Sequence, residues 1–381
     1  MRFRLISVAA VTCMLMACAL ASALSLEEAL ERALERPAIL TAQLELDEAR
    51  TNLERREADP LALRPEVEAA RQRFDLASAS FEQAYFQSVA EMGSAYANAL
   101  SARQEAELAS RRVSLNEQLV RAAEIRSANG TATALDLQEA QTALEGAQQA
   151  QSAAQEALNL AQRRLNGLLE ETVRLESLEF IPDDALVDVP PLERVLSAAE
   201  GHPIVLEAQQ ALELAELNSD LLDPVFTPRS EIESAGVQLE SAQEGAREVA
   251  RDYALEVRDL YSQAQTTRTA YNVARDRLTN AQERLAAQQN RLEAGLISEL
   301  ELRQTEIAFN EAEFEALSAR SAYLSALLAL QAGSLTELTG GFYNTARVGL
   351  EGSGGASDSA TGGSGNGETG SANEAISGGS E

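Results

Sequence analysis

The sequence is poor in the residues that carry metal, disulfide or nucleophilic chemistry. Among 381 residues there are two cysteines, one histidine and no tryptophan. Cys13 and Cys18 both lie near the N-terminus, so a chain processed on export has neither a disulfide nor a reactive thiolate. A single histidine, His202, cannot form a metal site or a catalytic triad with a second one, and its Gly-His-Pro setting predicts a solvated loop. We therefore expect no cofactor, no metal and no catalytic residue, and we predict that the chain is not an enzyme.

Lysine and aromatic residues are scarce as well. The 31 basic residues are all arginine, they face 60 acidic residues, and the formal net charge is −29. Repulsion between this charge and phosphate disfavours nucleic acid as a partner. Aromatic residues make up only 4% of the chain, which argues against a thick globular core and against the aromatic girdles of a membrane β-barrel. We expect a thin core of small side chains.

The N-terminal residues 1–23 have the layout of a secretory signal peptide. Two arginines precede an apolar stretch, which ends in Ala-Ser-Ala, so the mature chain is expected to begin near Leu24. Two alternatives stay open. The segment could be retained as an anchor, although its apolar part is short for a membrane span. It could also be cleaved before Cys18, because Leu-Met-Ala-Cys resembles a lipoprotein box and would place a lipid on that cysteine.

The rest of the chain repeats itself at a spacing of about 165 residues. The matches stay in register over the whole unit, which composition alone does not produce. The clearest pairs are Pro37 with Pro203, Asp59-Pro60 with Asp223-Pro224, Tyr96 with Tyr261, and Gly130 with Gly295. We therefore predict a signal peptide at 1–23, a first helical repeat at 24–176, a linker at 177–190, a second helical repeat at 191–345 and a disordered, acidic Gly/Ser-rich tail at 346–381.

Each repeat contains one long stretch without an internal proline, Glu66–Ala128 and Glu231–Ala294, which predicts a helix of about 95 Å. Small and apolar residues recur along both at alternating steps of three and four, the pattern of a coiled coil. Shorter helices return over 134–169 and 299–330. The predicted fold is therefore all-α, with long antiparallel coiled-coil helices in two homologous repeats. Alanine buries little area per residue, so further helices or subunits are expected to cover these seams, although a plain two-stranded rod stays open.

Several motifs together resemble those of the TolC-like outer-membrane efflux proteins. They are Ser-Leu-Glu-Glu-Ala-Leu at 25–30, the Pro-Pro linker, Gly-His-Pro at 201–203 and Arg-Leu-Glu-Ala-Gly-Leu-Ile-Ser-Glu-Leu-Glu-Leu at 291–302. The resemblance covers about residues 25–333. It implies a homotrimer whose helices line a periplasmic tunnel, and which docks on an adaptor (membrane fusion) protein linked to an inner-membrane pump or ATPase. The alternative is a coiled-coil scaffold or spacer of the cell envelope that transports nothing.

The same resemblance implies which residues meet the adaptor. Both repeats reverse direction at a short tip, and a glycine there suits the left-handed cap of one helix while a hydroxyl residue caps the next. The implied docking residues are Gly130, Thr131, Thr133, Gly295, Leu296 and Ser298. Acidic residues inside the tunnel mouth correspond to Asp136, Glu139 and Glu301, whose other interpretation is an ordinary solvated helix face.

One departure from the family is large. TolC-like proteins insert a pair of β-strands between the helices of each half, where this chain has only the segments 59–65 and 223–228. Seven residues cannot supply two membrane strands of about ten residues each. We therefore expect a TolC-like periplasmic α-barrel without a membrane β-barrel. Its expected location is the periplasm or the periplasmic face of the outer membrane, held there by a partner or by a lipid on Cys18.

Overall fold

The computed structural model describes residues 24–223 and 225–337. Within these ranges the chain is helical and contains no β-strand, apart from one isolated bridge between Leu24 and Leu178. The predicted signal peptide, the lipid site at Cys18 and the predicted tail lie outside the described residues. None of the helices in the described ranges is both long enough and apolar enough to cross a membrane.

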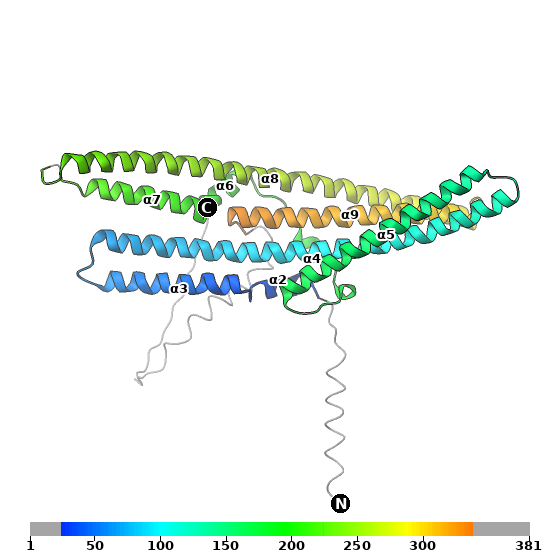
Figure 1. Ribbon diagram of the computed structural model, residues 1–381, viewed down its shortest axis with the longest axis horizontal. Coiled ribbons are helices and arrows are strands. Elements are labelled where there is room, and N and C mark those ends of the chain that lie inside the picture. The colour runs from blue at the N-terminus through cyan, green and yellow to red at the C-terminus, as the bar shows by residue number, and fades with distance from the viewer. Residues whose placement is uncertain (1–23, 224, 338–381) are drawn as a thin grey trace, which may run out of the picture. The chain divides into compact units, whose positions relative to one another are not determined.

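The two halves have matching elements (Figure 1). The first half contains α2 (Leu26–Ala33), α3 (Pro37–Ala58), α4 (Arg64–Ala128) and α5 (Ala134–Leu169). The second contains α6 (Leu192–Ala199), α7 (Pro203–Asp220), α8 (Arg229–Glu293) and α9 (Glu299–Ser334). Helices α4 and α8 have 65 residues each, and α5 and α9 have 36 each. The predicted all-α fold with two homologous repeats is confirmed.

Proline and capping residues explain where the helices begin. Pro37, Pro65 and Pro203 occupy the first turn of α3, α4 and α7, where no intrahelical N–H is needed and where the fixed φ suits a helix. Ser25 caps α2 by accepting a hydrogen bond from the Glu28 amide, at 3.1 Å. The sequence thus sets the helix boundaries locally.

Helix α4 is the central element of the described part. It packs against α2, α3 and α5 of its own half and against α7 and α9 of the other half, whereas α8 packs against α6, α7 and α9. The approach of α4 to α9 is close at Gly93, where a β-carbon would lie 2.3 Å from the Leu328 Cδ1 atom. Ser101 and Ser321 join the same pair of helices through a hydrogen bond of 3.1 Å. The two halves therefore share one core along α4.

The linker between the halves is tied to the middle of the long helices. The buried Tyr96 hydroxyl of α4 lies 2.8 Å from the Leu24 carbonyl oxygen and 2.7 Å from the Glu179 carbonyl oxygen. The Leu24 amide donates in turn to the Ser177 carbonyl, at 2.9 Å. Burial raises the pKa of Tyr96, so its hydroxyl remains a proton donor. This cluster fastens the start of the described chain to the linker.

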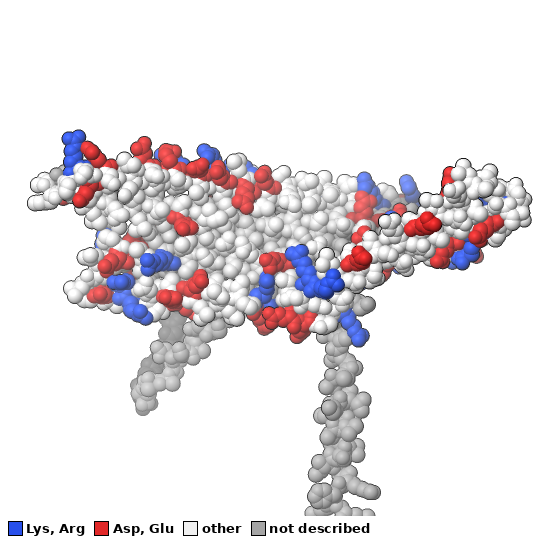
Figure 2. All heavy atoms as spheres, in the orientation of Figure 1, with Lys and Arg blue, Asp and Glu red and all other residues white. Residues whose placement is uncertain are grey.

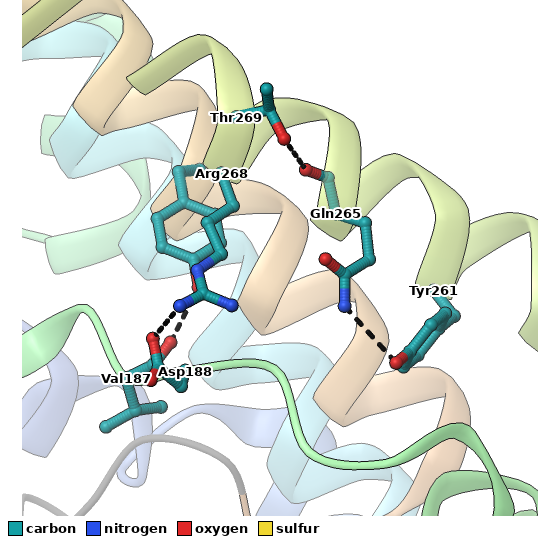
Figure 3. Close-up of polar contacts among 7 residues, drawn as sticks. Val187, Asp188, Tyr261, Gln265, Arg268 and Thr269 are labelled. Atoms are coloured by element: carbon teal, nitrogen blue, oxygen red, sulfur yellow. Dashed lines mark hydrogen bonds and ion pairs between the residues drawn. The ribbon is translucent and has the colours of Figure 1, made fainter. Parts of the chain in front are cut away.

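On the side of the second half, the linker meets α8 and α9. Asp188 pairs with Arg268 of α8, close to Val187 (Figure 3). The Tyr323 hydroxyl of α9 donates to the Val187 carbonyl at 2.6 Å, and Arg320 pairs with Asp183 at 2.6 Å. The linker is thus held to both halves by hydrogen bonds.

His202 is buried, so the prediction that it lies in a solvated loop was wrong. Only 3% of this residue is exposed, and its ring stacks on Tyr253 of α8 with a centroid separation of 4.4 Å. Its Nδ1 atom has no hydrogen-bond partner among the described residues. Burial lowers the pKa of the His202 imidazole, which favours the neutral ring. Its ring packs against α8.

Replacing Gly93 by alanine should destabilise the protein. The new methyl group would meet the buried Leu328, and overpacking costs about 1–3 kcal/mol, more than the 0.5–1 kcal/mol that alanine gains over glycine in a helix. We expect a lower urea midpoint of unfolding. Gly245→Ala in α8 is the matched control, because no atom lies within 4 Å of its would-be β-carbon. Equal stabilisation of both variants would contradict the close contact between α4 and α9.

Candidate functional site

Each long helix ends in a turn that reverses the chain, and the two turns are built alike. In the first turn, Gly130 has φ of +72°, its amide donates to the Ser127 carbonyl at 3.0 Å, and the Thr131 amide donates to the Arg126 carbonyl at 2.9 Å. The Thr131 hydroxyl donates to the same carbonyl at 3.0 Å. These bonds satisfy the last carbonyl groups of α4 in a Schellman motif, which needs a left-handed residue at the glycine position.

The second turn repeats this geometry at the end of α8. Gly295 has φ of +69°, and its amide donates to the Leu292 carbonyl at 2.8 Å. The Leu296 amide donates to the Arg291 carbonyl at 2.9 Å. The Leu296 side chain is 68% exposed, so it projects from the turn as an apolar knob. Arg126 and Arg291 were not predicted as tip residues, although the Schellman spacing places their carbonyl groups there.

Both returning helices begin with a complete capping box. The Thr133 hydroxyl accepts from the Asp136 amide at 3.2 Å, while an Asp136 carboxylate oxygen accepts from the Thr133 amide at 2.7 Å. Ser298 and Glu301 form the same pair of bonds, at 3.3 and 2.8 Å. The sequence predicted the hydroxyl caps but not the reciprocal role of the acids. Two of the three predicted tunnel-mouth acids therefore have a local structural task.

These bonds favour the ionised form of the two capping carboxylates. Hydrogen bonds from the Thr133 amide and hydroxyl lower the pKa of Asp136, and those from Ser298 lower the pKa of Glu301 in the same way. Both groups are fully exposed and ionised at neutral pH. Glu139, one turn further along α5, is exposed and lies outside the capping box. The structure thus gathers all the predicted residues except Glu139 into two similar turns with their capping boxes, and Figure 1 shows these turns at one end of the helices.

The equivalent helices of the two halves are covered to very different extents. Nineteen residues of α4 are buried but only four of α8, and eleven residues of α9 are buried but only three of α5. The reason is that α9 lies against α4, whereas α5 and α8 form no comparable interface within the described residues. Figure 2 shows uncharged side chains over the middle of the visible face, where α4, α7 and α9 meet. The surfaces of α5 and α8 that correspond to the buried interface between α9 and α4 are therefore exposed in the single chain.

No group of three or more His, Cys, Asp or Glu side chains within the described ranges is placed to hold a metal ion. All six predicted docking residues lie exposed in the two turns.

The sequence profile of the outer membrane efflux proteins matches residues 61–170 and 221–333 of this chain. The chain belongs to that family. The matched ranges span α4 with α5 and α8 with α9, so they contain both tips and every predicted tip residue. This family is defined by efflux rather than by a catalysed reaction. No curated protein matches the chain by sequence.

Solved structures of the same kind share its fold. The chain is similar to CusC, with 17% identity, a TM-score of 0.59, and 81% of this chain and 95% of that chain covered. It is similar to the open state of the outer membrane channel MtrE of Neisseria gonorrhoeae, with 17% identity, a TM-score of 0.57, and 81% and 88% covered. For the outer membrane protein VceC of Vibrio cholerae the values are 18%, 0.54, 83% and 96%. The resemblance to TolC-like proteins is confirmed at the level of the fold.

Removing the capping hydroxyls should loosen the tips without unfolding the protein. In Thr133→Ala and Ser298→Ala the amides of Asp136 and Glu301 lose their hydroxyl acceptors, so we expect faster hydrogen exchange in the peptides that contain these two amides, measured by mass spectrometry. Thr142→Ala is the control, because that hydroxyl donates to the Gln138 carbonyl and protects no amide. The carboxylates of Asp136 and Glu301 stabilise the same caps by accepting from the Thr133 and Ser298 amides. Because the pKa of each carboxyl is lowered in the folded protein, this stabilisation is complete above the usual pKa range of a carboxyl group and is lost as the pH falls through the lowered pKa. An effect that varied between pH 6 and 8 would contradict the capping role.

Proposed function

We propose that this efflux-family chain forms a trimeric, periplasmic helical conduit that docks through its two tips on an adaptor protein, as part of an efflux or type I secretion system. Membership of the outer membrane efflux family supports the efflux role. The observation that carries the trimer is the unequal coverage of equivalent helices. Within one chain, α9 covers a face of α4. The corresponding face of α8 would be covered by α5 of another copy.

This pairing is head to tail, because each copy offers α5 at one edge and α8 at the other. A head-to-tail contact produces a closed ring when the rotation between copies divides a full turn, and otherwise an open filament. Three copies with two repeats each give six similar units around a tunnel. Exposed apolar side chains on the open faces, Leu160 of α5 and Val273 of α8, favour such a contact.

A second candidate function, the envelope scaffold that transports nothing, has an observation of its own in its favour. At the spacing of the repeat, the buried Gly93 and Leu100 of α4 correspond to Arg258 and Gln265 of α8. Arg258 is exposed, and an arginine suits a solvated face better than a tight helix contact. In this reading the chain remains a monomer or dimer without a lumen.

The molar mass without detergent distinguishes the two functions. For residues 24–350, purified after export and measured by light scattering on a sizing column, the conduit predicts a stable soluble trimer. A cysteine pair then locates the contact, because neither Cys13 nor Cys18 is in this chain. Glu156→Cys with Thr266→Cys, the repeat equivalents of the bonded Ser101 and Ser321, should link copies on oxidation.

The matched control for this pair is Ser101→Cys with Ser321→Cys. Those side chains lie within hydrogen-bond distance in one chain, so oxidation should leave the mass of that variant unchanged. A monomer or dimer at micromolar concentration, together with no links between copies, would remove the conduit and favour the scaffold.

Docking at the tips is tested in cells of the native host. With a photoreactive amino acid at Leu296, irradiation should link the chain to a periplasmic adaptor protein, because this side chain projects from the second tip. The same probe at Leu44 of α3, which is 70% exposed, serves as control. Equal linking from both positions would contradict docking at the tips.

A further inference from the structure

The ends of the helices opposite the tips carry exposed apolar side chains. They belong to the turn between α3 and α4 and to the turn between α7 and α8. Large apolar residues are usually covered, and clustered exposed ones mark an interaction surface. The four side chains are Leu61 at 86%, Leu63 at 64%, Val225 at 81% and Phe226 at 85% exposure.

The two turns hold these side chains outward by the same device. An Asp59 carboxylate oxygen accepts from the Leu61 amide at 2.9 Å, and an Asp223 carboxylate oxygen accepts from the Val225 amide at 2.7 Å. The Asp59 and Asp223 carbonyl groups also accept, at 3.1 Å each, from the amides three residues on. These bonds hold the backbone of both turns in the conformation that leaves the apolar side chains exposed. Their exposure is therefore built into both repeats.

Both turns lie at the same end. Gln72, in the third turn of α4, accepts at its carbonyl a hydrogen bond of 2.9 Å from Gln210 of α7 and donates to Glu213 at 3.0 Å. Because these bonds join the part of α4 that follows the first turn to the part of α7 that precedes the second, both turns lie at one end of the helices, on the left in Figure 1. Figure 2 shows uncharged atoms at the outermost point of the α7–α8 turn, with charged side chains set back along α8.

We propose that these two turns insert into the surface of a lipid bilayer with zwitterionic headgroups. The proposal rests on the proposed function only in that the family belongs to the outer membrane. Side chains on the projecting ends of helices suit a broad, deformable apolar layer, where no partner groove is needed. Residues 55–68 and 220–233 together contain four arginines and eight acidic residues, so anionic headgroups would repel this end.

The absence of tryptophan makes a local test possible. Phe226→Trp places the only indole of the chain in the second turn. With the full chain and phosphatidylcholine vesicles, we expect its emission to move to shorter wavelength and to be quenched by brominated acyl chains. Because the probe reports only its own surroundings, attachment through another segment leaves it unchanged. Leu135→Trp, exposed in α5 beyond the first tip, is the matched control and should show neither effect.

A second variant tests the other apolar residues. Leu61, Leu63 and Val225 are changed to serine in the Phe226→Trp chain, and we expect vesicle affinity to fall by roughly tenfold or more. Folding should survive, because Leu63 is the N-cap of α4 and makes no capping bond, whereas serine can supply one.

The outcomes separate the possible occupants. An unchanged Phe226→Trp spectrum with vesicles overturns the proposal. So does a shift that depends on protein concentration without lipid, which would mean contact between copies. Stronger binding to vesicles containing phosphatidylglycerol overturns the choice of zwitterionic headgroups. Each chain carries both turns, so a monomer in light scattering would refute the conduit and leave this inference standing.

Discussion

A helix surface made of alanine and serine buries little apolar area in any single contact, and this constraint shapes the whole molecule. Helix α4 meets it by packing against helices of both halves, which buries side chains around much of its circumference. Glycine at position 93 leaves room for the Leu328 side chain of α9 in that packing. Helix α8 packs against fewer of the described helices and buries four residues where α4 buries nineteen.

The sequence predicted most of the fold because its signals are local. Prolines, glycines and hydroxyl residues set most helix ends within two residues, although α9 runs four residues beyond its predicted end at 330, and the repeat identified the equivalent elements. The heptad track predicted one seam along α4 but not its second buried face, because a periodicity shows that a helix is amphipathic without showing how many neighbours it has. The burial of His202 was missed for the same reason: its partner Tyr253 comes from a helix about 50 residues away.

The tips show the same division between local and distant information. Gly130, Gly295 and the two hydroxyl caps were predicted from short motifs, and their geometry follows those motifs. The acids Asp136 and Glu301 stand three residues after their caps, so the capping box was readable from spacing alone. The consequence of sequence differences between the repeats could not be predicted from short motifs. Arg258 takes the place of Gly93 in the second repeat, and its effect on packing can be judged only when the helix that lies against each position is known.

The bridge at Leu24 limits how the protein can be held at a membrane. Tyr96, which fastens that residue, lies 32 positions after Arg64, or about 48 Å along a helix from the apolar turns. Six residues separate Leu24 from Cys18, and even fully extended they reach only about 20 Å. If α4 stands perpendicular to the bilayer, a lipid on Cys18 would hold the bilayer near the level of Tyr96, in the middle of α4, and not at the apolar turns. In that orientation, a lipid tether and membrane-embedded turns cannot hold the same bilayer.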